Sequence, residues 1–427
     1  MSNSVPEGWK NIKFGDIAEI HKGLTYATTN YSDKENGFPF ITLKCIKKNG
    51  GFSKKGLKYY DGKYKPQHEV VKGDVVFANT DLTRDGDVVG SPLIVPYISR
   101  KKPNLISMDL SKVIPKRGTH KEFIYYWLTM PEVKRYMINF SAGSTVLHLN
   151  TSSVPNIPIL APPLPEQKKI AAILTSVDTV IEKTQAQIDK LKDLKTGMMQ
   201  ELLTKGIGHT EFKDSPVGRI PVEWGVVTVL ELGNGHKDTV QTGPFGAQLH
   251  SKDYVEEGIP LVLIKNIKED GLDDTDIPKI TEKDANRLSR YRLKEGDIVF
   301  SRVGRVGSCF LCSKNEEGWV FSGQTLRIRF NNSKVDLTYF NYALRTEEIQ
   351  KELIGESVGS TRSSINTTIL ESLSVKLPPI QEQKKIASIL QSLDSNIKSR
   401  ELKLKQLMSV KKALMQDLLT GKVRVKV

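Results

Sequence analysis

Residues 162–174 read PPLPEQKKIAAIL and residues 378–390 read PPIQEQKKIASIL, so one stretch occurs twice, 216 positions apart. A repeat at a fixed spacing indicates that one structural unit is used twice. Each copy leads into a long segment without proline, in which apolar residues recur every three or four positions as in an amphipathic helix. The sequence therefore predicts two long helices, one over 166–204 and one from 382 onward.

Written as heptads, the two segments have matching apolar seams. Both seams are interrupted at the same two places, where Thr184 matches Arg400 and Lys195 matches Lys411. This favours two helices packed against each other in a fixed register; the alternative is two separate helices that each cover their own domain. The predicted seam residues are Ile170, Leu174, Val177, Ile181, Ile188, Leu191, Met198, Ile386, Leu390, Leu393, Ile397, Leu404, Leu407, Leu414 and Leu418.

The ends of both helices are also marked. A helix of about 39 residues is about 58 Å long, which is more than one globular domain needs, so the segments have the length of spacers. The proline pair fixes where each helix starts, and Glu166 or Glu382 then meets its positive end. Gly206 and Gly421 follow the last apolar residues and are expected to be left-handed caps.

Composition is typical of a globular protein in a reducing compartment. The chain has 427 residues, three of them cysteines, and the N-terminus MSNSVPEGWK lacks a signal-peptide core. No apolar run reaches the roughly 18 residues of a membrane span, so we expect a cytoplasmic location. Cys309 and Cys312 form a CxxC, but Cys45 is the remaining cysteine and no histidine pair completes a zinc set, so no metal site is predicted.

The net charge of +14 points to a polyanionic partner and is unevenly distributed. Residues 1–165 carry 23 Lys and Arg against 14 Asp and Glu, whereas residues 205–381 carry 23 against 25. In the second region 10 of the 23 basic residues are Arg, the side chain that binds guanine edges and phosphates. A DNA-binding patch is therefore expected in the first region and remains possible in the second.

The repeat extends over whole domains. VPEGW, FPFITLKCI, GDVVFANT and the helical segment 121–137 of the first region are answered in order by IPVEW, IPLVLIKNI, GDIVFSRVG and the helical segment 336–353 of the second. Strand patterns dominate in both regions, and a short helix is expected at FGDIAEI. We predict four segments: a first domain over 1–165, a spacer helix over 166–205, a second domain over 206–381, and a second helix and tail over 382–427.

The loops of the two copies differ, which favours one task performed on two targets. HKGLTYATTNYSDKENG stands opposite QTGPFGAQLHSKDYVEEG, and ANTDLTRDGDVVG opposite SRVGRVGSCF, while both copies keep a Gly-Ser-Thr turn suited to phosphate. The alternative interpretation is that the Gly-Ser-Thr turn is an ordinary structural loop, which would have the same sequence. The candidate DNA-binding residues are Thr25, Tyr26, Arg84, Lys101, Ser144, Thr145, His148, Gln241, Lys252, Arg302, Arg305, Ser360, Thr361 and Arg362.

Catalytic signatures are missing from the sequence. It contains no GxxxxGK[ST] loop, no GxGxxG after a strand and no HExxH. The Glu-x-Lys pairs at 166–168 and 382–384 lie at predicted helix starts, not on the strand that a nuclease motif requires. The function classes that remain are a DNA-binding protein without catalytic residues and, as an alternative, a coiled-coil scaffold without DNA binding.

Two divergent domains, each followed by P-P-x-x-E-Q-x-x-I-A-x-I-L and a long helix, closely resemble the DNA-specificity subunit of type I restriction-modification enzymes. The resemblance covers nearly the whole chain and is most specific at EQKKIA, residues 166–171 and 382–387. It implies an α+β chain in which two target recognition domains form a pseudo-twofold tandem repeat, separated by two long helices in an antiparallel coiled coil.

The resemblance also implies a function and a set of partners. Each domain would read half of a split, asymmetric double-stranded DNA site, and the helices would dock two modification (methyltransferase) subunits. Those subunits would bring S-adenosylmethionine, and restriction subunits would bring ATP- and Mg-dependent translocation and cleavage. This chain itself would bind no cofactor. Since the loops of such domains vary with their target, the family supplies no base-reading residues to transfer.

Overall fold

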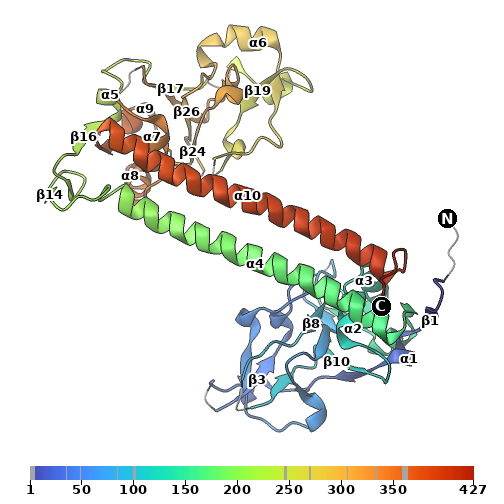
Figure 1. The fold of residues 1–427 in the computed structure, drawn as a ribbon. Coiled ribbons are helices and arrows are strands. Elements are labelled where there is room, and N and C mark those ends of the chain that lie inside the picture. Colours follow the sequence, from blue (N-terminus) through green and yellow to red (C-terminus); the bar gives the residue numbers. More distant parts are fainter. Residues whose placement is uncertain are drawn as a thin grey trace. The chain divides into compact units, whose positions relative to one another are not determined.

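The computed structural model describes residues 5–34, 36–48, 50–83, 85–99, 102–244, 248–268, 271–304, 306–331, 334–357 and 364–427. The chain divides into two compact units, unit 1 with residues 1–186 and 402–427 and unit 2 with residues 187–401. Each unit contains one globular domain and a part of both long helices, α4 (Leu164–Leu202) and α10 (Ile380–Leu419) (Figure 1). The two predicted helices are therefore confirmed, with ends two residues or fewer from the expected positions.

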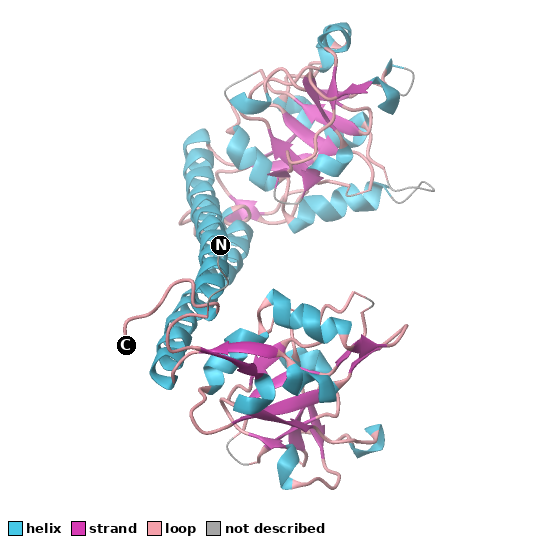
Figure 2. Cartoon of the chain, turned by 90° about the vertical axis from the view of Figure 1, so that its right-hand side faces the viewer, coloured by secondary structure: helices cyan, strands magenta, loops and turns pink. Residues whose placement is uncertain are grey.

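The domain of unit 1 is built on two four-stranded sheets, in the orders β2-β10-β6-β8 and β4-β3-β9-β5. The first is antiparallel throughout, and the second contains one parallel pair, β3 with β9. Helices flank the strands (Figure 2). The strands are β2 (Ala18–Lys22), β3 (Phe38–Ile41), β4 (Lys58–Tyr60), β5 (Glu69–Val70), β6 (Val75–Ala78), β8 (Pro92–Ile94), β9 (Asn104–Ile106) and β10 (Leu110–Pro115); the helices are α1 (Phe14–Ile17), α2 (Lys121–Leu128) and α3 (Pro131–Asn139).

Unit 2 repeats this plan. Its sheets have the orders β17-β26-β23-β24 and β18-β22-β19-β25, and the parallel pair is β19 with β25. The strands are β17 (Val240–Thr242), β18 (Tyr254–Val255), β19 (Ile259–Val262), β22 (Lys279–Ile280), β23 (Ile298–Ser301), β24 (Cys309–Leu311), β25 (Val320–Phe321) and β26 (Thr325–Ile328); the helices are α5 (Val229–Leu232), α6 (Glu282–Arg287), α7 (Leu337–Ala343), α8 (Glu347–Ser357) and α9 (Thr367–Ser372). The predicted α+β tandem repeat is confirmed.

Several predicted elements are shorter in the structure. The helical segment 121–137 is two helices because Pro131, which lacks an N–H group, starts α3. The segment 336–353 also divides, and there the Gln350 side chain satisfies the freed carbonyl of Leu344 at 2.8 Å. FGDIAEI is helical only to Ile17, and FPFITLKCI is a strand only to Ile41.

Within each unit, α4 and α10 run antiparallel, as predicted. In unit 1 the Lys411 ammonium of α10 lies 2.6 Å from the Asp178 carboxylate of α4, and in unit 2 Lys195 of α4 lies 2.5 Å from Asp394 of α10. Every predicted seam residue is buried or half-buried. The fully enclosed ones, less than 9% exposed, are Ile170, Leu174, Ile188, Ile386, Leu390, Ile397 and Leu418.

The lysine that interrupts each seam is held by a cluster of three side chains. In unit 1 the Asp178 carboxylate accepts a hydrogen bond from the Tyr126 hydroxyl of α2 at 2.9 Å and pairs with Lys411, whose ammonium lies 5.8 Å from the centre of the Tyr126 ring. Burial raises the pKa of Tyr126, so its hydroxyl remains a donor. We call this the Tyr–Asp–Lys cluster of unit 1.

Unit 2 contains the same cluster at positions 216 residues away. The Tyr342 hydroxyl donates to Asp394 at 2.6 Å, and Lys195 pairs with that carboxylate while lying 5.5 Å from the Tyr342 ring centre. Each cluster joins one helix of the domain to both long helices. Both lysines are partly buried, with 25% of the Lys411 side chain and 21% of the Lys195 side chain exposed, and the paired carboxylate offsets part of the cost of placing a charge in an apolar seam.

The start of α4 is fastened to the domain by the Glu-Gln pair of the repeat. The Glu166 carboxylate, 2% exposed, accepts hydrogen bonds from the Trp9 indole at 3.0 Å and from the Arg424 guanidinium at 2.7 and 2.9 Å. Gln167 accepts from the backbone N–H of His120 at 2.9 Å and donates to the Pro162 carbonyl at 2.8 Å. The tail after α10 therefore lies against the first residues of the domain.

The start of α10 is fastened in the same way in unit 2. Glu382 accepts from the Trp224 indole at 3.0 Å and from His209 at 2.9 Å, and Gln383 accepts from the backbone N–H of Asp336 at 2.8 Å. The turns that bring His209 and Arg424 to these carboxylates depend on Gly206 and Gly421, whose φ angles of 71° and 72° confirm the predicted left-handed caps. Within the described ranges, no helix is long and apolar enough to cross a membrane.

The Tyr–Asp–Lys cluster of unit 1 can be tested by stability. We expect Lys411→Met to lower the free energy of unfolding by about 1 to 3 kcal/mol, because it leaves the Asp178 carboxylate, 22% exposed, without its cation. Lys403→Met, on an exposed turn of the same helix, is the matched control and should change stability little. Urea unfolding measures both. Equal stability of the two variants would show that the ion pair contributes nothing.

Candidate nucleic-acid interface

A small three-stranded sheet carries three of the predicted DNA-binding residues of unit 1. It consists of β11 (Ser141–Ala142), β12 (Leu147–Leu149) and β7 (Thr80–Asp81). Ser144, Thr145 and His148 are exposed on this hairpin, and His148 lies opposite Thr80 in register. At Gly143 a side chain is excluded, because a Cβ would lie 1.9 Å from the Val146 carbonyl oxygen. The hairpin thus presents hydroxyls and an imidazole to solvent on a tight turn.

The loop beside this hairpin is organised by a buried carboxylate. Asp81 is fully buried and accepts hydrogen bonds from the backbone N–H of Thr83 at 2.8 Å, from that of Val89 at 2.9 Å and from that of Val88. Burial opposes its ionisation, but these hydrogen bonds outweigh that effect and lower the pKa of the Asp81 carboxyl. The loop that follows β7 is therefore held in place; Arg84, predicted to bind DNA from it, lies outside the described residues.

The segment after β2 contains two predicted DNA-binding residues, Thr25 and Tyr26, which lie in different environments. Thr25 is exposed, but the Tyr26 ring is half-buried and packs edge-on against Phe40 at 4.9 Å between ring centres. Tyr26 therefore belongs mainly to the aromatic core of the second sheet. The Asp109 carboxylate accepts a hydrogen bond from the Thr80 hydroxyl of the small sheet at 3.2 Å. Burial is the main cause of the raised pKa of Tyr31, and the Asp109 charge adds to it.

In unit 2 two of the predicted candidates, Arg302 and Gln241, lie in less accessible places. Arg302 is half-buried, and its Nε donates to the Ile365 carbonyl at 3.1 Å, so the side chain fastens the segment that corresponds to β12. Gln241 was predicted on a loop, but it lies in β17 with 8% of its surface exposed and cannot reach a duplex from there. Lys252 is exposed on a short turn. Lys101, Arg305, Ser360, Thr361 and Arg362 lie outside the described residues.

The arginine content of unit 2 has a largely structural explanation. Arg329 binds the buried Asp297 carboxylate through two hydrogen bonds of 2.6 and 2.5 Å. Arg327 is 1% exposed, donates to the Asp238 carbonyl at 2.7 Å, and has its pKa lowered to about 10, first by burial. Arg345 donates to the Cys309 carbonyl at 2.9 Å. These three arginines support the domain and are therefore engaged, so the DNA-binding patch that the arginine content left possible in this region would have to use other residues.

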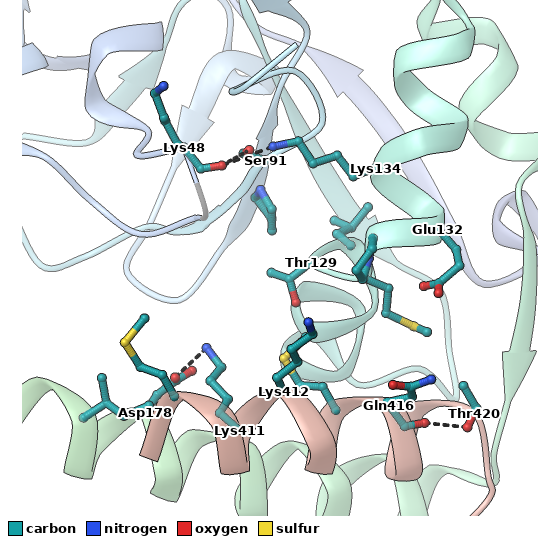
Figure 3. A pocket seen from close by; sticks show the side chains of 17 residues that line it. Lys48, Ser91, Thr129, Glu132, Lys134, Asp178, Lys411, Lys412, Gln416 and Thr420 are labelled. Carbon is teal, nitrogen blue, oxygen red and sulfur yellow. Dashed lines mark hydrogen bonds and ion pairs between the residues drawn. The ribbon is translucent and has the colours of Figure 1, made fainter. Parts of the chain in front are cut away.

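A groove of about 460 Å³ opens in unit 1 between the α2–α3 junction and the helix pair (Figure 3). Its apolar lining includes Leu128, Met130 and Met415; Lys134 projects from one wall and Lys412 from the other. In unit 2 the residue at the α7–α8 junction that corresponds to Thr129 is Arg345, which donates to the Cys309 carbonyl of β24. Two carboxylates line the groove, Glu132 and Asp178, and Asp178 is engaged in the Tyr–Asp–Lys cluster.

No metal-binding set of three or more His, Cys, Asp or Glu side chains occurs in the part of the chain that the structure describes. The three cysteines, Cys45, Cys309 and Cys312, are buried free thiols. Burial raises the pKa of each of them, which keeps the thiols protonated and unreactive. The features that remain as candidates for a functional site are the exposed loops on two similar scaffolds.

The sequence matches a model of the type I restriction modification DNA specificity domain twice, over residues 6–193 and 221–408. The type I restriction enzyme MjaVIII specificity subunit of Methanocaldococcus jannaschii is 27% identical over 430 residues, covering 99% of this chain and 94% of that protein. The EcoBI specificity subunit of Escherichia coli is 21% identical over 407 residues, covering 91% of this chain and 80% of that protein.

Solved structures share the fold. The S subunit of a type I restriction-modification system from M. genitalium superposes with a TM-score of 0.62 at 13% identity, covering 98% of both chains. A chain from a study of complex assembly and conformational transition of the type I R-M system gives a TM-score of 0.55 at 17% identity, over 98% of this chain and all of that one. With its family domain matched twice over most of its length, this chain belongs to the DNA-specificity subunits of type I restriction-modification enzymes.

Proposed function

We propose that the chain recognises a bipartite, asymmetric site on double-stranded DNA and holds two modification subunits, and through them restriction subunits, on that site. The observation that carries the proposal is a duplicated scaffold with divergent exposed loops: the sheets, the Tyr–Asp–Lys clusters and the Glu-Gln attachments repeat, whereas the loops do not. A specificity subunit is non-catalytic, so methylation and cleavage belong to its partners. S-adenosylmethionine, ATP and Mg are accordingly assigned to them, in the cytoplasm where host DNA lies.

The exposed hairpin of unit 1 is the best-supported reading element. Its hydroxyls and imidazole can donate to phosphates and to base edges, and the Asp81 carboxylate keeps the neighbouring loop in place. In unit 2 the sequence counterpart of this hairpin, 216 positions later, contains Ser360, Thr361 and Arg362, and we propose the same role for it. Each half would then contribute its own base preference.

Sequencing of methylated DNA tests the proposal directly. A host that expresses the complete system should carry adenine methylation at one split motif with a fixed gap. Exchange of residues 206–381 for those of another specificity subunit should change the second half of the motif and leave the first half unchanged. A methylated motif that is the same for both chains would contradict the proposal, and so would the absence of any motif.

The hairpin can be tested with Ser144→Ala, Thr145→Ala and His148→Ala combined. We expect binding to a duplex with the intact site to weaken by about tenfold or more, because a lost base contact costs about 1 to 3 kcal/mol. Ser176→Ala, Thr196→Ala and Ser409→Ala, on exposed positions of the long helices, form the matched control and should bind like the parent. Thermal unfolding should be unchanged in both sets. Parent-like affinity of the hairpin variant would exclude these residues as contacts.

The helix pair is proposed to set the gap between the half-sites. One heptad inserted after Ala186 and another after Glu401 keeps the seam in register and lies outside both Tyr–Asp–Lys clusters. Each heptad adds about 10.5 Å to its helix, which corresponds to about 3 base pairs at 3.4 Å each. The methylated motif should therefore keep its bases and gain about 3 positions in its gap. A heptad replaced by another of equal length is the control, and an unchanged gap after insertion would refute the idea.

A further inference from the structure

The connection after β3 in unit 1 is strongly basic and lies outside the loops predicted to contact DNA. Residues 43–57 contain five lysines and no acidic residue, and the next residue, Lys58, begins β4. This charge run supplies more than half of the excess positive charge of the first region. The lysines are Lys44, Lys47, Lys48, Lys54, Lys55 and Lys58.

The turns that carry these lysines lie against one another. The Thr42 hydroxyl donates to the Gly56 carbonyl at 2.8 Å, and a Cβ at Gly56 would lie 2.1 Å from the carbonyl carbon of Lys44. The 54–56 turn therefore sits directly on residues 44–45. This brings Lys44, Lys54 and Lys55 to one corner of the sheet, next to the edge strand β4. We call Lys44, Lys54, Lys55 and Lys58 the lysine patch.

The patch is available to a ligand. All four of its side chains are exposed, and none has a carboxylate within 4.0 Å among the residues that the structure describes. The neighbouring Lys48 pairs with Asp87 of the loop that Asp81 organises, so the patch continues toward the candidate interface. Four exposed cations without counterions are a surface for a polyanion.

The equivalent connection of unit 2 has the opposite charge. Residues 263–278, after β19, contain two lysines and five acidic residues. Both lysines are neutralised within the connection, since Lys265 lies 2.6 Å from Asp276 and Lys268 lies 3.6 Å from Asp273. The same backbone plan thus carries an exposed cationic surface in one unit and an internally paired acidic one in the other.

We infer that the lysine patch binds the DNA phosphate backbone without regard to sequence, and that unit 2 has no such surface in the equivalent place. The inference rests on the proposed DNA-binding function and specifies how the two halves share it. Unit 1 supplies the salt-dependent binding that holds any duplex, whereas unit 2 contributes through its reading loops. Lysine ammonium groups suit this task because they act as point charges on phosphate and do not distinguish bases.

The test uses the full chain assembled with its modification subunits. Lys44, Lys54, Lys55 and Lys58 are changed together to Gln, and binding is measured on a duplex with the methylated motif and on one without it, between 50 and 200 mM salt. Release of counterions predicts that the slope of log affinity against log salt falls by about 0.9 for each phosphate contact removed, hence by up to about 3.6. The preference for the motif over the other duplex should change by less than about threefold, because phosphate contacts carry no sequence information.

Two further variants control for charge and position. Changing the same four lysines to Arg keeps the charge and should preserve the slope. Changing Lys265, Lys268, Lys279 and Lys283 of unit 2 to Gln removes as many cations, and the slope should fall by less than 1, because the first two are already paired with carboxylates. An equal fall for the unit 2 variant would overturn the assignment to unit 1.

The outcomes distinguish this inference from the proposed function. If the parent prefers the motif but the Gln variant of the patch keeps the parental slope, the inference fails and the proposed function stands. If the Gln variant instead loses its modification subunits on gel filtration, the patch is a protein-binding surface and the inference is again overturned. If the parent prefers no duplex at any salt concentration, the proposed function itself fails.

Discussion

The pairing of one lysine with one aspartate and one tyrosine, formed once in each unit, is the constraint on which the architecture depends. An apolar seam alone would let two long helices slide or rotate, since any apolar residue can pack against another. Lys411 pairs with Asp178, and the Tyr126 hydroxyl holds α2 on the same carboxylate. Register and domain attachment are thereby favoured by one partly buried polar cluster in each unit, as polar seam residues favour one register in coiled coils.

The two copies of the domain share these attachments, whereas other parts of the domain differ between them. The Glu-Gln pair and the polar clusters recur at offsets of 215 or 216 residues and the sheets recur in the same order, while the connection after β3 is basic and its counterpart after β19 is acidic. Unit 2 also uses its arginines inside the domain, where they satisfy carbonyls and the buried Asp297. The two halves therefore share a mechanical design and differ in their electrostatics, as expected if they meet DNA in different ways.

Local periodicity accounts for what could be predicted. The long helices, their ends, the seam and the repeated order of strands depend on spacing within a segment, which the sequence displays directly. The sequence also shows Lys195 and Lys411 as interruptions of the seam, but it does not show their partners. Asp178 and Asp394 fall on the polar side of an ordinary helical pattern, and the tyrosines lie 52 residues earlier in the chain. Arginine count was a poor guide in unit 2, since composition does not distinguish a buried guanidinium from an exposed one. The helix break at Pro131 and the lysine run after β3 are local sequence signals, so both can be predicted from the sequence.

The attachments also explain why the reading loops can vary without loss of geometry. Each domain is joined to its long helix at the first turn, through Glu166 or Glu382, and again at Asp178 or Asp394. The two points are 12 residues apart, about 18 Å along the helix axis. One attachment would leave the domain free to rotate about it, whereas two fix both its position and its rotation on the helix. Neither attachment includes a residue of the divergent loops. A substitution in a loop can therefore change which bases are contacted while the orientation of that loop on its own helix stays the same.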